Sequence, residues 1–229
     1  MKEIVIVCSG SAANPGEDRL IGWQDRDLSE EGFGLAREAA DTLIREGYTF
    51  DMAFTSVLRR AIQTLWEILA RMELHWIKEN KNWRLNGRYY GKLEGMTHEE
   101  VARAYGTENL TAWLSDYRAL VPCVALDDPE HPSHDPRYWD LIPDEIPCGE
   151  NLVETFSRVF PYWENKIAPA VEIGRKVLVV SHYNSTRALI SMIEGIPIEE
   201  IVQHPVRRGV PVVYQLDGDM RFGSRKELS

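Results

Sequence analysis

The sequence lacks two features that would point to a membrane or a nucleic acid: a long hydrophobic run and a surplus of basic residues. After Lys2 and Glu3 come only about five apolar residues, too few for a signal peptide or for the roughly 20 of a membrane helix. The formal net charge is −10, whereas nucleic acids and anionic membranes bind clustered lysines and arginines. We therefore expect a cytoplasmic protein with neither kind of partner.

Cysteine is scarce as well, with three residues in the whole chain. Their odd number and wide spacing fit neither a disulfide framework nor a zinc motif, so reduced thiols are the expected state. His98, His131 and His134 lie near acidic residues, but their spacing matches no compact metal site. We predict no bound metal and no other cofactor.

No repeat, low-complexity segment or shift in composition divides the chain. Its 229 residues are 44% hydrophobic, which is enough for one sizeable core, and we predict a single domain over residues 1–229. Apolar runs typical of buried strands alternate with helical spacing at 29–46 and 57–72; the runs are residues 3–7, 51–54, 176–180 and 212–216. This alternation predicts a three-layer α/β fold with a mostly parallel sheet flanked by helices.

Two segments have distinctive patterns. In the helix expected at 29–46, Leu35, Ala39, Leu43 and Ile44 fall on one face, which should pack on the sheet. Residues 122–147 contain six prolines among acidic and histidine residues, and are too long for an ordinary connection. We interpret them as a Pro-rich surface insertion.

Polar residues follow three of the expected strands. In open α/β sheets, ligands bind beyond the carboxyl ends of the strands. Cys8-Ser9-Gly10, Thr55-Ser56 and Ser181-His182 should therefore meet around one crevice, although the first and last are about 170 residues apart.

Several multi-residue motifs extend over roughly residues 3–217. They are Ile21-Gly22-Trp23 with Asp27-Leu28-Ser29, Phe54-Thr55-Ser56-Val57-Leu58-Arg59-Arg60-Ala61, Trp83-Arg84-Leu85-Asn86, Arg88-Tyr89-Tyr90-Gly91, His134-Asp135-Pro136-Arg137-Tyr138 and His182-Tyr183-Asn184-Ser185. Together they resemble the cofactor (2,3-bisphosphoglycerate)-dependent phosphoglycerate mutases of the histidine phosphatase superfamily. The resemblance implies the phosphoglycerate mutase-like fold.

The resemblance fails at the residues that carry the family's chemistry. Where the family has Arg-His-Gly, with the His accepting the phosphoryl group, this chain has Cys8-Ser9-Gly10. A serine cannot replace that His without a neighbouring base. The family's acid/base glutamate corresponds to Gly87, which cannot transfer a proton. The resemblance thus implies a fold without phosphohistidine chemistry.

The substrate-binding positions have changed too. The family's Asn, Thr and Lys correspond to Pro15, Ile21 and His98, and its consecutive arginines to Leu114 and Ser115. With the Arg replaced by Cys8, four cationic groups are lost, and His98 returns at most a fractional charge. The ligand-binding residues implied by the match or by their place in the crevice are Ser11, Arg60, Arg88, Tyr90, His98, His182, Tyr183 and Asn184, with Glu17 and Arg19 on the first loop.

Several roles remain open at these positions. Cys8 beside His182 fits a thiolate nucleophile as well as a small buried apolar residue. Ser9 as a nucleophile activated by His182 would need a third, orienting group. Arg207-Arg208 either form a solvated pair or restore positive charge to the site.

The favoured interpretation is a ligand-binding or regulatory pseudoenzyme that has lost mutase activity. Its expected partners are a small anionic or neutral metabolite and, through the surface that relatives use, a second copy or an active mutase. The alternative is a repurposed enzyme of specialised metabolism that acts on a less phosphorylated, carboxylated or neutral substrate in the old crevice. Its catalytic residues would be Cys8, Ser9 or His182, or else Tyr183. A residual phosphatase or mutase is a third alternative. The fold alone cannot choose among them.

Overall fold

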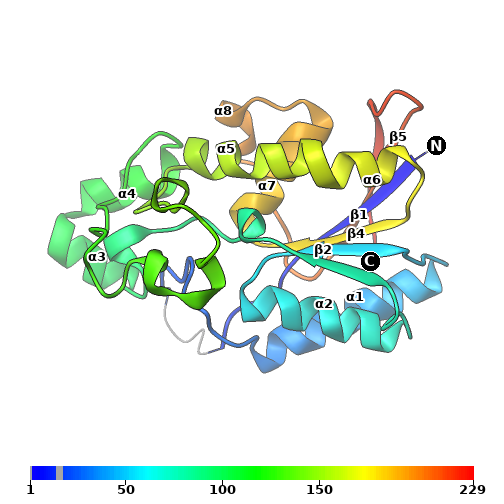
Figure 1. Ribbon diagram of the computed structural model, residues 1–229, viewed down its shortest axis with the longest axis horizontal. Coiled ribbons are helices and arrows are strands. Elements are labelled where there is room, and N and C mark those ends of the chain that lie inside the picture. Colours follow the sequence, from blue (N-terminus) through cyan, green and yellow to red (C-terminus); the bar gives the residue numbers. More distant parts are fainter. Residues whose placement is uncertain (1, 14–17) are drawn as a thin grey trace.

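The computed structural model describes residues 2–13 and 18–229, so that Pro15 and Glu17 lie outside the described residues. Within them, six strands form one sheet in the order β3-β2-β4-β1-β5-β6 (Figure 1). The strands are β1 (Lys2–Cys8), β2 (Met52–Thr55), β3 (Lys78–Lys81), β4 (Val177–Ser181), β5 (Pro211–Leu216) and β6 (Phe222–Glu227). The first four pair in parallel, and β5 and β6 pair antiparallel. The predicted mostly parallel α/β sheet is confirmed.

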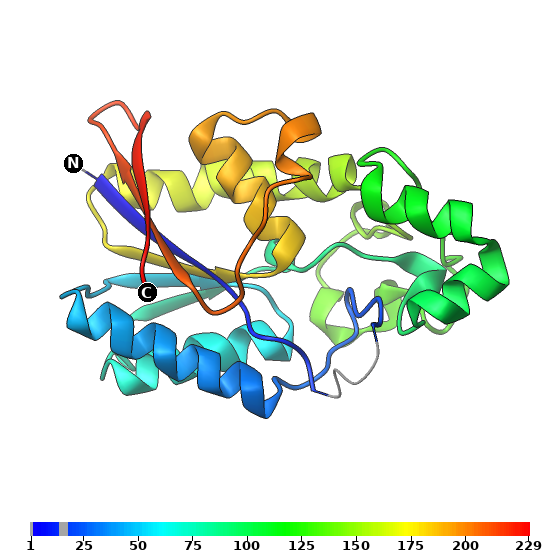
Figure 2. The same cartoon turned by 180° about the vertical axis from the view of Figure 1, so that it is seen from behind.

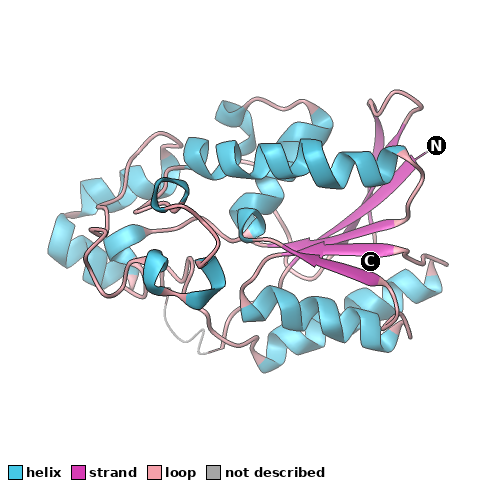
Figure 3. Cartoon of the chain, viewed as in Figure 1, coloured by secondary structure: helices cyan, strands magenta, loops and turns pink. Residues whose placement is uncertain are grey.

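Helices cover both faces of the sheet (Figures 1 and 3). On one face lie α1 (Glu30–Arg45) and α2 (Arg59–Arg71), and on the other α5 (Leu152–Tyr162), α6 (Ala168–Glu172), α7 (Tyr183–Glu194) and the short α8 (Ile198–Ile201). Side chains alternate along β1, so Val5 and Val7 join the core under α1 and α2, while Ile4 and Ile6 join the core under α5 and α7. The three-layer arrangement follows from these two cores.

The helix predicted at 29–46 forms as α1, and its first turn is capped by Ser29, whose side chain accepts from Gly32 N. The predicted sheet-facing stripe is wrong at Ile44, which is 49% exposed. Ala39 and Leu43 are buried as expected, but two alanines complete the stripe in place of the larger residues. Small side chains let α1 approach the sheet closely.

A second group of elements lies beyond the carboxyl ends of the parallel strands, at the left of Figure 1 and the right of Figure 2. It contains α3 (His98–Tyr105), α4 (Thr107–Ser115) and short 3₁₀ turns, three of them within 122–147. That Pro-rich segment has an exposed side, where Trp139 lies, and a packed side. Val124, Tyr138 and Ile146 are buried against aromatic residues that include Trp23.

The expectation of reduced thiols is wrong for two of the three cysteines, because Cys123 and Cys148 form a disulfide. Val124 N donates to the carbonyl of Cys148 at 2.8 Å, which brings the two ends of the Pro-rich segment together. The two cysteines are 25 residues apart in the sequence, and this wide spacing does not indicate that they pair. Cys8 remains a free, buried thiol. None of the helices in the described part of the chain has the length and apolar character needed to cross a membrane.

Candidate functional site

The loops that follow β1, β2 and β4 meet at one edge of the sheet, as predicted from the strand ends. Ser9 N donates to the carbonyl of Ser181 at 2.8 Å. Ser56 Oγ lies 2.8 Å from His182 Nε2, and both side chains are buried. His182 is the N-cap residue of α7, so its position is fixed by the junction between β4 and that helix. The expected contact between the first loop and the His182 region is confirmed.

A cavity of about 150 Å³ opens beside His182, and we call it the crevice. Its lining residues are Ala12, Arg19, Leu20, Ile21, Gly22, Arg60, Gly87, Arg88, Tyr90, His182, Tyr183, Asn184 and Arg208. Among the described residues, this lining includes four arginines and no carboxylate. Such a lining attracts anions and offers no acidic group for proton transfer.

All four arginines already donate to backbone carbonyls, and Arg19, which donates to the carbonyl of Gly95 at 2.6 Å, also forms an ion pair with Glu100 at 3.5 Å. Arg60 donates to the carbonyls of Gly22 at 2.6 Å and Gln24 at 2.9 Å, and desolvation lowers its pKa to about 10. Arg88 donates to three backbone carbonyls, and burial lowers its pKa as well. Arg60 therefore holds the crevice wall at Gly22, whereas Arg88 is anchored to backbone outside the lining.

His182 is buried among cations. Desolvation lowers its pKa well below the usual value, and the charges of Arg60, Arg208 and Arg158 lower it further. The imidazole is therefore neutral near pH 7 and bonds Ser56 as a neutral ring. In this state it can give or accept one hydrogen bond but adds no charge to the crevice.

Cys8 and Ser9, the two candidate nucleophiles, do not line the crevice. Cys8 is 2% exposed and lies with Ile6 and Thr186 around a small pocket under α7. Burial raises the pKa of its thiol, so the reactive thiolate is disfavoured. Ser9 is 0% exposed, and its Oγ has no hydrogen-bond partner among the described residues.

Arg207 and Arg208, left open by the sequence, point to different places. Arg208 lines the crevice, and its Nη1 lies 3.4 Å from the carbonyl of Ser9. Arg207 instead forms an ion pair at 3.6 Å with Glu227 on β6 and is largely exposed. Arg208 therefore adds a cation next to the position where the family has its phospho-accepting histidine.

Gly87 lies at the wall of the crevice without a conformational need for glycine, because its φ is not positive. A Cβ atom built there would lie 3.4 Å from His182 Cβ, an ordinary contact distance. The Gly87 carbonyl accepts from Trp23 Nε1 at 2.6 Å and from Arg158 at 2.7 Å. The backbone is thus held in place, and a side chain at this position would point toward the imidazole.

A buried ion pair behind this wall was not predicted from the sequence. Arg158 Nε lies 2.6 Å from Glu150 Oε1, and both side chains are almost fully buried. The guanidinium also donates to the carbonyls of Asn86 and Gly87, so the pair positions the strip of backbone beside His182. A sequence signal existed, because Arg158 falls in the apolar stripe of its helix.

The remaining predicted residues divide into two groups. Tyr90, Tyr183 and Asn184 line the crevice, and the Tyr183 hydroxyl accepts from Arg187 at 2.9 Å. The others do not line it: Ser11, His98, Leu114 and Ser115. His98 Nδ1 instead lies 2.8 Å from Asp18 Oδ2. Within the described residues, no cluster of His, Cys, Asp and Glu side chains has the arrangement of a metal site.

Comparison with known proteins shows the family and the fold of this chain. A family model described as the histidine phosphatase superfamily (branch 1) matches residues 4–123. The α-ribazole phosphatase of Shigella flexneri superimposes with a TM-score of 0.75 and 19% identity, over 99% of this chain and 96% of that one. A mycobacterial glucosyl-3-phosphoglycerate phosphatase, solved with VO3, superimposes with a TM-score of 0.72 and 20% identity, over 100% of this chain and 98% of that one. YhfR of Bacillus stearothermophilus superimposes with a TM-score of 0.73 and 18% identity, over 97% of this chain and 95% of that one. At these identities the structural likeness shows the shared fold.

Proposed function

The chain belongs to the histidine phosphatase superfamily, branch 1, and from that membership we propose that it is a non-catalytic member that binds a small anionic metabolite in the crevice. The observation that carries the proposal is the lining of the crevice, with four arginines and no carboxylate among its described residues. Two of the four, Arg60 and Arg88, are buried, and buried cations are costly unless an anion compensates them. A bound phosphate or carboxylate would supply that compensation.

Loss of catalysis is the second half of the proposal. Phosphoryl transfer through the enzyme needs an acceptor that reaches the phosphate and a group that moves a proton. Ser9 is fully buried beside the crevice rather than in its lining, and Gly87 has no side chain. Arg60 and His182 of the phosphate-binding positions are retained, while the reacting groups are lost.

A repurposed reaction has less support from the same geometry. The Cys8 thiol lies under α7 and its pKa is raised, so it is a poor nucleophile toward a ligand in the crevice. Ser56 is the hydroxyl in contact with His182, but it does not line the crevice either. Association with a second copy or with an active mutase stays a prediction.

Calorimetric titration of the purified protein with inorganic phosphate, acetate and uncharged glycerol tests the proposal. The matched variants are Arg208→Ala and Arg207→Ala, adjacent arginines of which only the first lines the crevice. One charge-assisted hydrogen bond is worth about 1.5–3 kcal/mol, so Arg208→Ala should weaken anion binding roughly tenfold to a hundredfold. Arg207→Ala should bind as the wild type does. An absence of anion binding, or equal losses in both variants, would contradict the proposal.

A further inference from the structure

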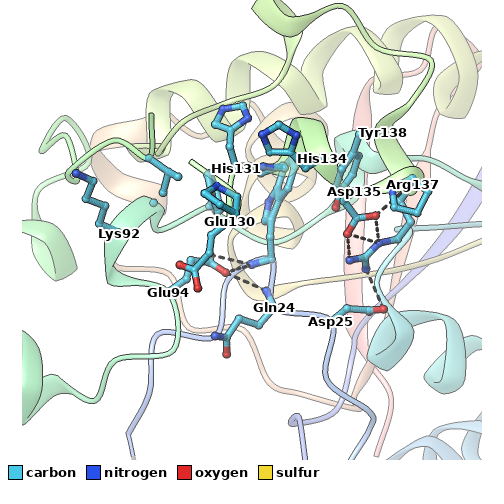
Figure 4. Close-up of a pocket in the computed structure, with 17 residues that line it drawn as sticks. Gln24, Asp25, Lys92, Glu94, Glu130, His131, His134, Asp135, Arg137 and Tyr138 are labelled. Atoms are coloured by element: carbon cyan, nitrogen blue, oxygen red, sulfur yellow. Dashed lines mark hydrogen bonds and ion pairs between the residues drawn. The ribbon is translucent and has the colours of Figure 1, made fainter. Parts of the chain in front are cut away.

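A second cavity, of about 520 Å³, is lined by Trp23, Gln24 and Asp25, which follow the crevice residue Gly22 in the sequence (Figure 4). Its walls come from the first loop, from residues 89–94 and from residues 129–138 of the Pro-rich segment. It shares no described lining residue with the crevice. Its volume falls in the range of roughly 300–1,000 Å³ that is typical of small-molecule sites.

Part of the lining is apolar and aromatic. The ring of Trp23 lies 5.2 Å from that of Tyr89 and 5.0 Å from that of Tyr138, centroid to centroid. Val124 and three prolines add further apolar surface; the prolines are Pro129, Pro132 and Pro136. The three rings are at most 5% exposed, so they form a rigid backing to the cavity, and the remaining apolar surface suits the hydrocarbon or aromatic body of a ligand.

Most of the charged groups in the lining are already paired. Arg137 binds both Asp135 and Asp25, and its Nη1 lies 2.9 Å from Asp25 Oδ2 (Figure 4). The side-chain oxygens of Glu94 accept from three backbone N–H groups. These groups shape the cavity and leave little free hydrogen-bonding capacity for a ligand.

Two charged side chains in the lining have no partner among the described residues, Lys92 and Glu130. Lys92 lies on the turn Gly91–Leu93, and Glu130 lies on the Pro-rich wall, so the two charges come from different walls. Their signs are opposite. His131 adds no charge, because burial lowers its pKa and its Nδ1 contacts Ser133 Oγ at 2.9 Å.

The walls are held in place before any ligand arrives. The disulfide between Cys123 and Cys148 closes the base of the Pro-rich segment. At Gly91, whose φ is +56°, a Cβ atom would lie 2.3 Å from the carbonyl of Pro122, so only glycine permits this close approach between the two walls. Preorganised walls reduce the entropy cost of binding.

We propose that this second cavity binds a small zwitterion with an apolar body, whose carboxylate contacts Lys92 and whose ammonium group contacts Glu130. The observations that carry it are the cavity, its aromatic wall and two charges of opposite sign that have no partner in the described part of the chain. The site is independent of the function proposed for the crevice, because no described lining residue belongs to both.

A set of three probes with the same aromatic body tests the proposal by calorimetry: L-phenylalanine, 2-phenylethylamine and 3-phenylpropanoate. The zwitterion should bind at least roughly tenfold more tightly than either singly charged probe, because it alone pairs with both Lys92 and Glu130. Equal affinity of the amine or of the acid would overturn the assignment of two charges. A dissociation constant above roughly 10 mM for all three would overturn the site itself.

Single-charge variants separate the two contacts. Lys92→Met should weaken L-phenylalanine binding roughly tenfold and leave the binding of 2-phenylethylamine unchanged. Glu130→Gln should weaken the binding of both ligands. Lys78→Met and Glu108→Gln remove exposed charges outside the cavity and serve as matched controls, with unchanged binding expected. If either control weakens L-phenylalanine binding as much as its counterpart, long-range charge explains the effect and the proposal fails.

Discussion

Replacing Glu150 by glutamine should destabilise the protein strongly, because it removes the charge that compensates a buried guanidinium. The carboxylate of Glu150 accepts from Arg158 Nε at 2.6 Å and Nη2 at 3.0 Å, and from Tyr89 N at 2.8 Å. Side-chain exposure is 6% for Arg158 and 2% for Glu150, so water cannot replace the lost partner. Breaking such a buried pair on one side typically costs about 3–5 kcal/mol.

In a domain of this size, each kcal/mol shifts the unfolding midpoint by about 2–4 °C, so Glu150→Gln should lower it by roughly 6–20 °C. Urea unfolding followed by tryptophan fluorescence gives the free energy directly. Trp23 and Trp83 report on the site, since their ring centroids lie 5.6 and 5.9 Å from Arg158 Cζ.

A matched control and a double variant make the test specific. Glu99→Gln breaks the exposed pair with Arg103 on α3 and should change stability little. The double variant Glu150→Gln with Arg158→Met removes both charges. Its free energy of unfolding should therefore fall by less than the sum of the decreases in the two single variants. A decrease below about 1 kcal/mol in the free energy of unfolding of Glu150→Gln would refute the reasoning, because a buried uncompensated charge destabilises a fold by more than that.

Three further predictions follow from groups near the two cavities. Burial raises the pKa of Glu94 from 4.5 to about 8, so the folded state retains a proton that the unfolded state has lost; the free energy of unfolding should therefore fall as the pH rises between these values. In urea unfolding at a series of pH values, Glu94→Gln should remove this part of the slope, and an unchanged slope would argue against the assignment. Gly87→Glu should place a carboxylate beside the imidazole and raise its pKa, which NMR titration of the histidines would detect; an unaltered titration would mean that the new side chain points away. Peptide mapping without reductant should recover Cys123 joined to Cys148, with Cys8 reacting only slowly with a thiol reagent in the folded protein; a free Cys148 or a rapidly labelled Cys8 would contradict the structure.

The sheet and the meeting of its carboxyl ends were predictable because strand alternation and strand ends are local properties of the sequence. The bond from Ser9 N to Ser181 and the contact between Ser56 and His182 follow directly from that topology. Motif resemblance added the identity of the fold, which periodicity alone cannot supply.

Other features depend on how separate segments pack, and the sequence pattern could not decide them. Arg207 and Arg208 are neighbours of the same type, and the register of their loop against the end of β1 selects which one enters the crevice. The pairing of Cys123 with Cys148 requires the path of the Pro-rich segment between them. Ile44 lies outside the buried stripe of α1, which passes through Ala36, Ala40 and Leu43 instead. In each case tertiary geometry overrides a pattern read along the chain.

The central claim, that the crevice binds a phosphorylated or carboxylated anion without transferring its phosphoryl group, is tested most directly by phosphorus NMR of the protein with an equimolar amount of 3-phosphoglycerate. The account predicts a broadened or shifted ester resonance that persists, because four arginines line the crevice while Ser9 is buried and Gly87 carries no acid. Growth of an inorganic phosphate resonance, migration of the ester or a phosphohistidine resonance would contradict the loss of catalysis, and an unperturbed ester resonance would contradict the binding.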